Sequence, residues 1–387
     1  MKILYHHRTA AQDGQTVHIE EMLKALRAAG HEVLMVGPRM RAKSFGKSSG
    51  FLSLLRKFVP AALYELMELA YSVRAYAKLS RAYNEFQPDI LYERYNLYLL
   101  SGAWLSEKKG IPYILEVNSP LSQERYKYGD LKLLNLARKI EQRCWKAADM
   151  CLPVTQVLAD ILVDNGVKPD KITVIHNGID PDKFNSNMNS ASARSELKLD
   201  GKTVLGFTGF VREWHKLDDI IRLIATNKEK HNLHLLVIGD GLTSQESMNL
   251  AHALGVDDCV TFLGLVERDK VGYYTSAFDI ALQPAVTNYA SPLKIFEYLA
   301  MGIPIIAPDQ PNIREILTSK YDSILFNPDI KHSLEDAIMA MVDDPAICKK
   351  LGDNAKITLH DRQYYWSSNA EKVINISQKL MAYKKGD

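Results

Sequence analysis

The sequence predicts an α/β protein with two Rossmann-like domains that face each other across a cleft. Three observations lead to this expectation. The chain has 387 residues, more than a single hydrophobic core usually serves. Short apolar runs alternate with stretches of helical periodicity, which is typical of parallel sheets built from β-α-β units. The alternation stops once, at the polar segment 185–195, and then begins again.

Composition restricts the class of protein further. Hydrophobic residues make up 47% of the chain and charged residues 24%, as in a globular protein, and the net charge of +2 gives no basic footprint for nucleic acid. The four cysteines lack the close spacing of metal or redox sites, so we expect a reduced, cytoplasmic protein. The apolar run at the amino terminus is too short for a signal peptide, and the apolar stretch Phe58 to Val73 is interrupted by Glu65 and Glu68.

The strands are expected in two sets of six. The first set is Ile3–Tyr5, Glu32–Gly37, Asp89–Glu93, Tyr113–Val117, Met150–Pro153 and Thr173–Ile175. The second set is Thr203–Thr208, Leu233–Ile238, Val260–Leu263, Asp279–Gln283, Ile303–Ala307 and Ser323–Phe326. We therefore expect an N-terminal domain over residues 1–185, a linker, and a C-terminal domain over residues 196–364. Ligands of such sheets bind at the carboxyl ends of the strands.

The stretch from Ser291 to Pro304 carries the strongest functional signal. It lies between two predicted strands, so a helix begins there just after a strand has ended. The free N–H groups and the dipole of a helix start stabilise a phosphate. Lys294 and Glu297 fall on the loop-facing side of this helix, whereas Phe296 and Leu299 fit core positions. A phosphate at the helix start and a ribose diol on Glu297 would together account for a nucleotide.

At these residues the chain resembles the retaining glycosyltransferases of family four (glycosyl transferases group 1), which have the GT-B fold. That family usually has two glutamates separated by seven residues, and Glu297 matches the second, which holds the donor ribose. Tyr289 stands in place of the first, and Ala290-Ser291-Pro292 in place of the usual Gly-Phe-Gly. A subset of the family has a similar Ser-Pro-Leu-Lys start. The resemblance implies donor contacts from this region, made by Tyr289, Ser291, Leu293, Lys294 and Glu297.

The loop after the strand Thr203–Thr208 contains the next set of candidates. Relatives place an arginine and a lysine there to hold the diphosphate, which suits a planar guanidinium and a compact ammonium. In this chain Phe210 and His215 occupy those places, so we expect Arg212 and Lys216 to supply the charge from shifted positions. The alternative is a solvated arginine and lysine beside a buried tryptophan. The resemblance also implies donor contacts from this half of the chain, through Gly209, His215 and Gly241.

Further candidates lie in the first half. In the loop from His6 to Gln15 only Gly14 matches a glycine pair that relatives place beside the donor phosphate, and Asp13 precedes it near the acceptor. Many relatives have a histidine near the donor sugar where this chain has Asn118, which keeps a hydrogen-bonding side chain but cannot transfer a proton. Glu116 and Glu124 are candidates for contacts with the sugar or acceptor. A capping asparagine and a surface ion pair would explain Asn118 and Glu124 equally well.

A basic segment in the first half suggests a membrane surface. It precedes an apolar helix in the part of the chain that the resemblance assigns to the acceptor, and many members of the family glycosylate lipid-linked acceptors. An anionic leaflet attracts such a combination. A solvated loop before a helix that packs on its own sheet is the alternative. The basic residues are Arg39, Arg41, Lys43, Lys47, Arg56 and Lys57.

Taken together, the residues and the resemblance predict a retaining glycosyltransferase that transfers a sugar from a UDP- or GDP-sugar to an acceptor hydroxyl. Its products would be cell-surface polysaccharide, glycolipid or glycoconjugate. The candidate catalytic residues are Arg212, Lys216 and Asn118. No Asp-x-Asp motif stands out, so no metal and no cofactor is expected. The C-terminal helix, about 365–387, is expected to pack on the first domain. Two alternatives stay open: a nucleotide-sugar 2-epimerase of the same fold, and a catalytically silent sugar-nucleotide-binding subunit.

Overall fold

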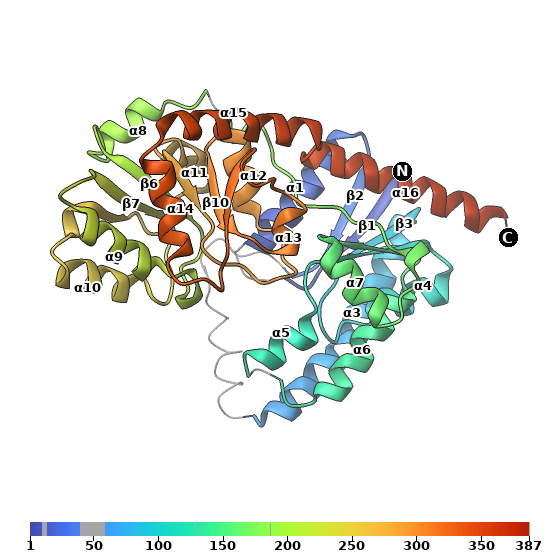
Figure 1. Cartoon of the computed structure of the whole chain (residues 1–387). Helices are drawn as coiled ribbons and strands as arrows, with labels where there is room; N and C mark the ends of the chain where they lie inside the picture. The colour runs from blue at the N-terminus through green and yellow to red at the C-terminus, as the bar shows by residue number, and fades with distance from the viewer. Residues whose placement is uncertain (10–13, 39–58, 130, 186, 387) are drawn as a thin grey trace. The chain divides into compact units, whose positions relative to one another are not determined.

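Two parallel sheets organise the chain, each within its own unit (Figure 1). The computed structural model describes residues 1–9, 14–38, 59–129, 131–185 and 187–386. The first unit contains Met1–Asn177, Tyr289–Ser291 and Trp366–Asp387, and the second contains Gly178–Asn288 and Pro292–Tyr365. The prediction of two Rossmann-like α/β domains is confirmed.

The first unit has a five-stranded sheet in the order β2-β1-β3-β4-β5, with every neighbouring pair parallel. Every residue of β3 and β4 is buried, because helices cover both faces, as is usual for parallel sheets. The strands are β1 (Lys2–His6), β2 (Glu32–Val36), β3 (Ile90–Arg94), β4 (Tyr113–Val117) and β5 (Met150–Pro153). The helices are α1 (Gly14–Ala28), α3 (Ala61–Phe86), α4 (Ser101–Lys109), α5 (Leu121–Lys127), α6 (Leu134–Ala147), α7 (Gln156–Asp164) and α16 (Trp366–Gly386).

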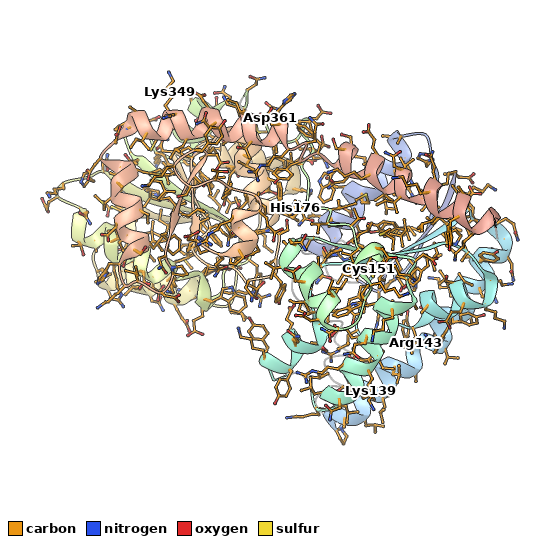
Figure 2. The ribbon with its side chains drawn as sticks, turned by 45° about the vertical axis from the view of Figure 1, so that its right-hand side comes forward. Lys139, Arg143, Cys151, His176, Lys349 and Asp361 are labelled. Carbon is orange, nitrogen blue, oxygen red and sulfur yellow. The ribbon has the colours of Figure 1, made fainter. Side chains whose placement is uncertain are left out.

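The last helix of the chain belongs to this first unit, since α16 packs along α1. The rings of His18 and Trp366, one from each helix, meet edge to face at 4.8 Å. Figure 2 shows the division between surface and core on the opposite side of the sheet: Lys139 and Arg143 point outward from α6, whereas Cys151 lies inside on β5. Among the described residues, no helix has both the length and the apolar character needed to cross a bilayer.

The second unit has a six-stranded sheet in the order β11-β10-β9-β6-β7-β8, also parallel throughout. The strands are β6 (Thr203–Thr208), β7 (Leu233–Ile238), β8 (Val260–Phe262), β9 (Ile280–Leu282), β10 (Ile305–Pro308) and β11 (Ser323–Phe326). Helices α9 (Leu217–Asn227), α10 (Ser244–Ala253) and α14 (Ser333–Val342) border one core; α12 (Leu293–Met301) and α15 (Pro345–Asp361) border the other. The shorter helices are α8 (Ser190–Glu196), α11 (Arg268–Thr275) and α13 (Pro311–Arg314).

Two local expectations differ from the structure. Residues Thr173–Ile175 do not form a strand, although the N–H groups of Thr173 and Ile175 donate to the carbonyls of Cys151 and Pro153 along the edge of β5. The segment 185–195 is not without structure, because α8 begins within it. The Asn189 side chain caps that helix by accepting a hydrogen bond from the N–H of Ser192. Short polar helices of this kind lack the apolar periodicity that sequence analysis depends on.

Candidate active site

Strands β6 and β7 end in two turns that pack backbone against backbone. Gly209, directly after β6, has a φ of 119°, which only glycine adopts readily. A Cβ on Gly239 would lie 2.1 Å from the carbonyl oxygen of Gly209, and one on Gly241 would lie 1.8 Å from that of Val211. The predicted donor-binding residues Gly209 and Gly241 are therefore brought together at the carboxyl ends of neighbouring strands.

The loop after Gly209 makes a short turn that holds Arg212 and His215. The guanidinium carbon of Arg212 lies 4.9 Å from the ring centroids of both Phe210 and Trp214, and its side chain is exposed. The backbone N–H of Arg212 donates to Nδ1 of His215 over 3.1 Å. Lys216 follows with a φ of 52° and is the N-cap residue that precedes α9. The reversal at Lys216 explains why His215 and Lys216 point in different directions.

His215 is a buried, neutral imidazole. Burial, together with the positive charges of Lys294 and Arg212, lowers its pKa to about 3. Because Nδ1 accepts the hydrogen bond from Arg212, the neutral ring carries its proton on Nε2. The ring centroid lies 4.9 Å from that of Phe207 on β6. His215 therefore presents a fixed N–H donor close to the end of the strand.

Lys294 comes to the same place from another element, the first turn of α12. Its ammonium nitrogen lies 3.7 Å from the centroid of the Phe207 ring and would lie 3.3 Å from a Cβ on Gly209. Within the described chain no group pairs with this ammonium by a hydrogen bond or an ion pair within 4 Å. Desolvation lowers its pKa to about 7, although Glu297 acts in the opposite direction.

Glu297 lies on α12 one turn after Lys294. Desolvation raises the pKa of this carboxyl group, and Arg268 and Lys294 partly oppose that rise. The helix is fixed in register with β6, because the Tyr298 hydroxyl accepts a hydrogen bond from the N–H of Thr208 over 3.0 Å. Phe296 and Leu299 lie fully buried on the opposite side. Helix α12 thus holds Lys294 beside the turn at Gly209 and places Glu297 one turn further along the helix.

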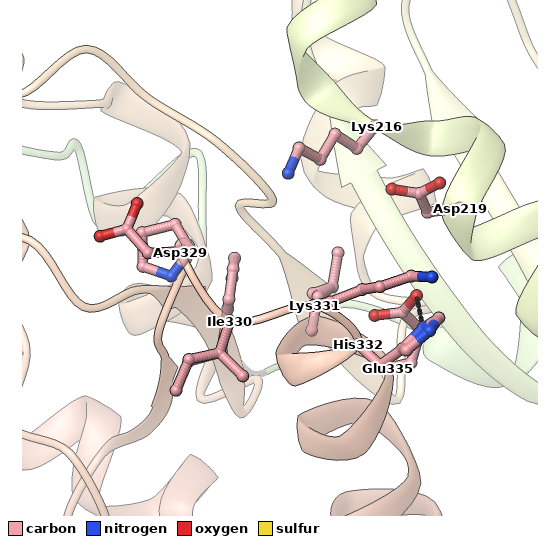
Figure 3. A pocket seen from close by; sticks show the side chains of 10 residues that line it. Lys216, Asp219, Asp329, Ile330, Lys331, His332 and Glu335 are labelled. Carbon is pink, nitrogen blue, oxygen red and sulfur yellow. Dashed lines mark hydrogen bonds and ion pairs between the residues drawn. The ribbon is translucent and has the colours of Figure 1, made fainter.

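Lys216 lines a different part of the second unit, a pocket of about 290 Å³ between the start of α9 and the segment from β11 to α14. Figure 3 shows its side chain extending into this pocket. The pocket walls also contain Asp219, Asp329 and Glu335, so three carboxylates face two lysines and a histidine. Neither His215 nor Lys294 nor Glu297 lines it. This balance of charge is a poor match for a diphosphate.

The residues just before α12 belong to the first unit. The hydroxyl of Tyr289 donates to Glu124 over 2.9 Å, and its carbonyl oxygen accepts from the hydroxyl of Thr155 over 2.8 Å. The carbonyl oxygen of Ser291 accepts from the side-chain amide of Asn177 over 2.6 Å. Tyr289 and Glu124, two separate candidates in the sequence, are therefore hydrogen-bonded partners.

At the carboxyl end of β4, Glu116 is the centre of a buried polar cluster. Its carboxylate accepts from the Tyr92 hydroxyl (2.8 Å) and from the Asn118 amide (2.6 Å), and forms an ion pair with Arg94. Nδ1 of His18 lies 3.3 Å away. Burial would raise the pKa of Glu116, but His18, Arg94 and these donors hold it below its ordinary value.

This cluster changes the interpretation of two candidates. Glu116 is 2% exposed and its carboxylate is fully occupied, so it is suited to positioning rather than to contact with a sugar. Because the Asn118 amide nitrogen donates to Glu116, the amide oxygen is left to accept a hydrogen bond from another group. Tyr92, Arg94 and His18 were not expected from the sequence as partners of Glu116. The polar end of β3, Tyr92-Glu93-Arg94, could have indicated the first two of these partners, because β3 pairs in parallel with β4 and Arg94 lies opposite Glu116.

Where the structure describes them, the remaining candidates in the first half of the chain make no contact that defines the site. Gly14 is the exposed first residue of α1. Asp13 lies outside the described residues, as do the basic residues Arg39 to Lys57. In the described part of the chain, no group of three or more histidine, cysteine, aspartate or glutamate side chains is arranged to hold a metal ion.

Comparison with known proteins places both halves of the chain. Residues 12–183 match the family model described as Glycosyltransferase Family 4, and residues 189–358 match Glycosyl transferases group 1. The chain is 26% identical over 287 residues to the alpha-monoglucosyldiacylglycerol synthase of Streptococcus pneumoniae, a match that covers 71% of this chain and 64% of that protein. It is 21% identical to a GDP-mannose-dependent alpha-mannosyltransferase of Mycobacterium tuberculosis, over 86% of this chain and 85% of that one.

The match to several other relatives is shorter, since it spans 55% of the length of an uncharacterized glycosyltransferase of Methanocaldococcus jannaschii and 50% of one from Haemophilus influenzae. Among solved structures, the fold is similar to that of Anabaena HepE in complex with UDP, with a TM-score of 0.76, 17% identity, and coverage of 98% of this chain and 100% of that one. The fold is therefore GT-B. By its two family models and these relatives, the chain belongs to the family 4 type of glycosyltransferases.

Proposed function

We propose that this protein is a retaining glycosyltransferase that moves a sugar from a nucleoside-diphosphate sugar to an acceptor hydroxyl. The observation that carries the proposal is the ammonium of Lys294 beside the turn at Gly209, in the first turn of α12, with Glu297 one turn later on the same helix. An ammonium near a helix start suits a diphosphate, and a carboxylate one turn later suits a ribose diol. The donor is proposed to be a UDP- or GDP-sugar.

The other candidates take supporting roles in this proposal. Arg212 lies on the same loop as His215 and would reach the diphosphate from its stacked position. Asn118, oriented by Glu116, would accept a hydrogen bond from a hydroxyl of the transferred sugar. Glu124, joined to Tyr289, would contact the sugar or the acceptor. Tyr289, Ser291 and Leu293 would border the donor ahead of α12.

Two alternatives have a specific basis. A nucleotide-sugar 2-epimerase shares the GT-B fold, and a silent binding subunit would tolerate Tyr289 in place of a glutamate. Incubating the protein with a panel of radiolabelled nucleotide sugars, with and without a membrane extract, separates the three. We expect label to move to an acceptor only when the extract is present. A new nucleotide sugar formed without extract would indicate the epimerase, and binding without any product would indicate the silent subunit.

We expect transfer to be independent of metal ions. In the proposed site, side chains and a helix start stabilise the leaving diphosphate, so no divalent cation is needed for that purpose. The check is to repeat the transfer assay in excess EDTA, which should leave the rate unchanged. Loss of activity in EDTA that magnesium or manganese restores would contradict this prediction.

The acceptor is proposed to be a glycan or a lipid-linked acceptor at the cytoplasmic face of a membrane. The Streptococcus pneumoniae relative is named as a synthase of a glucosyldiacylglycerol, a lipid product. Each basic side chain near an anionic leaflet contributes about 1 kcal/mol, an attraction that salt screens. The basic residues from Arg39 to Lys57 would supply it.

We therefore expect reversible, salt-sensitive binding to vesicles that contain anionic lipid. Replacing Arg39, Arg41, Lys43 and Lys47 by glutamine should weaken the binding, as measured by co-sedimentation at two salt concentrations. Equal partitioning onto neutral and anionic vesicles, or onto neither, would instead favour a solvated loop and a soluble acceptor.

A further inference from the structure

The two loop positions that carry cations in relatives carry no charge here. Phe210 is apolar, and His215 is neutral because burial lowers its pKa to about 3. A diphosphate that leaves with additional negative charge still needs a cation beside it. We compare three candidates for that cation, namely Arg212 and Lys216 on the loop and Lys294 in the first turn of α12.

The surroundings of these three side chains differ. Arg212 is exposed and stacks on Phe210 and Trp214. Lys216 extends into the pocket with Asp219, Asp329 and Glu335, whose carboxylates already supply negative charge (Figure 3). Lys294 is partly buried against Phe207, and none of the described groups accepts a hydrogen bond from it. Of the three, Lys294 has the most to gain from a bound anion, because its charge is desolvated and no described group pairs with it within 4 Å.

The position of Lys294 is unfavourable for the protein without ligand. It is a cation in the first turn of a nine-residue helix, where the helix dipole is itself positive. Lys294 and Arg212 also act together on His215, so positive charge is concentrated around that ring. Proteins keep such destabilising charges mainly at functional sites. The position of Lys294 therefore indicates a functional role.

We propose that Lys294 is the catalytic cation of this glycosyltransferase and that neutral His215 donates a second hydrogen bond, so that together they stabilise the leaving diphosphate. Both side chains contact the buried ring of Phe207. The centroid of the His215 ring lies 4.9 Å from the Phe207 centroid, and the Lys294 nitrogen lies 3.7 Å from it. Gly209 leaves open the space beside the ammonium. The inference depends on the proposed function and assigns Lys216 no part in the chemistry.

In the proposed reaction Lys294 and His215 neither form a covalent bond nor give up a proton. The bond between the anomeric carbon and the β-phosphate oxygen breaks, and its electron pair stays on that oxygen. The acceptor oxygen bonds to the same face of the anomeric carbon, and its proton passes to the departing phosphate. Lys294 keeps its proton and His215 keeps its Nε2 proton, so both interactions strengthen only as charge develops on the phosphate.

The test compares Lys294→Met with Lys216→Met, a matched loss of one ammonium from the same unit. Calorimetry is run with UDP, GDP, ADP and the corresponding nucleosides, and turnover is measured in the radiolabel assay. We expect Lys294→Met to lower kcat by about 100- to 1,000-fold, as for removal of one oxyanion-stabilising donor. It should weaken diphosphate binding more than tenfold and leave nucleoside binding unchanged. Lys216→Met should stay within threefold in every measurement.

Two further readouts separate a chemical role from a structural one. Affinity for the diphosphate should fall as pH rises above about 7, where free Lys294 loses its proton, and Lys294→Met should lack this dependence. Adding His215→Lys to Lys294→Met, which restores a cation at the place usual in relatives, should recover part of the lost turnover. If Lys294→Met does not fold, Lys294→Gln takes its place in every comparison.

The assignment is overturned if Lys294→Met keeps kcat and diphosphate affinity within threefold of the unsubstituted protein. It is also overturned if Lys216→Met lowers kcat and diphosphate affinity as much as Lys294→Met does. Those results would leave the proposed function intact. If the unsubstituted protein binds none of the diphosphates, the proposed function fails and this assignment fails with it.

Discussion

Replacing Glu116 by alanine is expected to lower the free energy of unfolding of the first unit by about 3–5 kcal/mol. The substitution leaves the Arg94 guanidinium buried without its carboxylate and removes an acceptor from Tyr92 and Asn118. Urea unfolding followed by tryptophan fluorescence measures this, because Trp104, Trp145 and Trp366 all lie in the first unit. Such a loss is a large fraction of the stability of an ordinary domain.

Glu107→Ala is the matched control, since Glu107 pairs with Arg143 on the surface, with side-chain exposures of 43% and 54%. We expect that variant to lose less than about 1 kcal/mol. The pKa of Glu116 is held low, so its contribution is present above the pKa of an unfolded glutamate and is lost as pH falls through the lower folded value. The difference between Glu116→Ala and the unsubstituted protein should therefore shrink in acid. Equal losses for Glu116→Ala and Glu107→Ala would show that the buried cluster is not structural.

The second large effect is expected from Glu297→Ala, which should weaken nucleotide binding by about 1.5–3 kcal/mol, or roughly 10- to 150-fold. A ribose diol would lose a charged acceptor from a partly desolvated site. Calorimetry with both nucleosides and nucleoside diphosphates makes the check specific, because losing a ribose contact weakens both, whereas loss of a diphosphate contact at Lys294 weakens only the second.

Glu335→Ala serves as the control for that experiment, since Glu335 is a carboxylate of the same unit that lines the pocket of Lys216. Its affinity for nucleotides should equal that of the unsubstituted protein. Desolvation raises the pKa of Glu297, so its carboxylate is protonated early as pH falls. Nucleotide binding should therefore begin to weaken, on lowering the pH, at a value above the usual range of a glutamate. Unchanged affinity in Glu297→Ala would remove the ribose assignment.

The sheets could be predicted from the sequence because buried parallel strands are short, continuous apolar runs. Five of the six strands expected in the first half and all six in the second correspond to observed strands. Thr173–Ile175 has the same apolar character but pairs along β5 through isolated hydrogen bonds, a distinction that depends on neighbours and not on composition. Helix α8 was missed because a polar helix on a surface has no marked periodicity.

The candidate site was predictable where helix geometry alone sets direction. Residues three apart on a helix lie on one face, so Lys294 and Glu297 could be placed together from their spacing. The loop before α9 could not be read in this way. Which side chain turns inward depends on the left-handed backbone at Lys216 and on the hydrogen bond from Arg212 to His215. Neither feature can be recognised from the residue types alone. The burial of Glu116 likewise depends on Arg94 and Tyr92 from the adjacent strand.

The central claim is that a nucleoside diphosphate binds beside α12, at the ends of β6 and β7. A crystal structure with whichever of UDP, GDP or ADP binds most tightly tests it most directly. We predict ribose hydroxyls within hydrogen-bonding distance of the Glu297 carboxylate, and phosphate oxygens within hydrogen-bonding distance of Lys294 Nζ and His215 Nε2. Nucleotide density in the pocket lined by Lys216, with Lys294 and Glu297 left without contact, would contradict it.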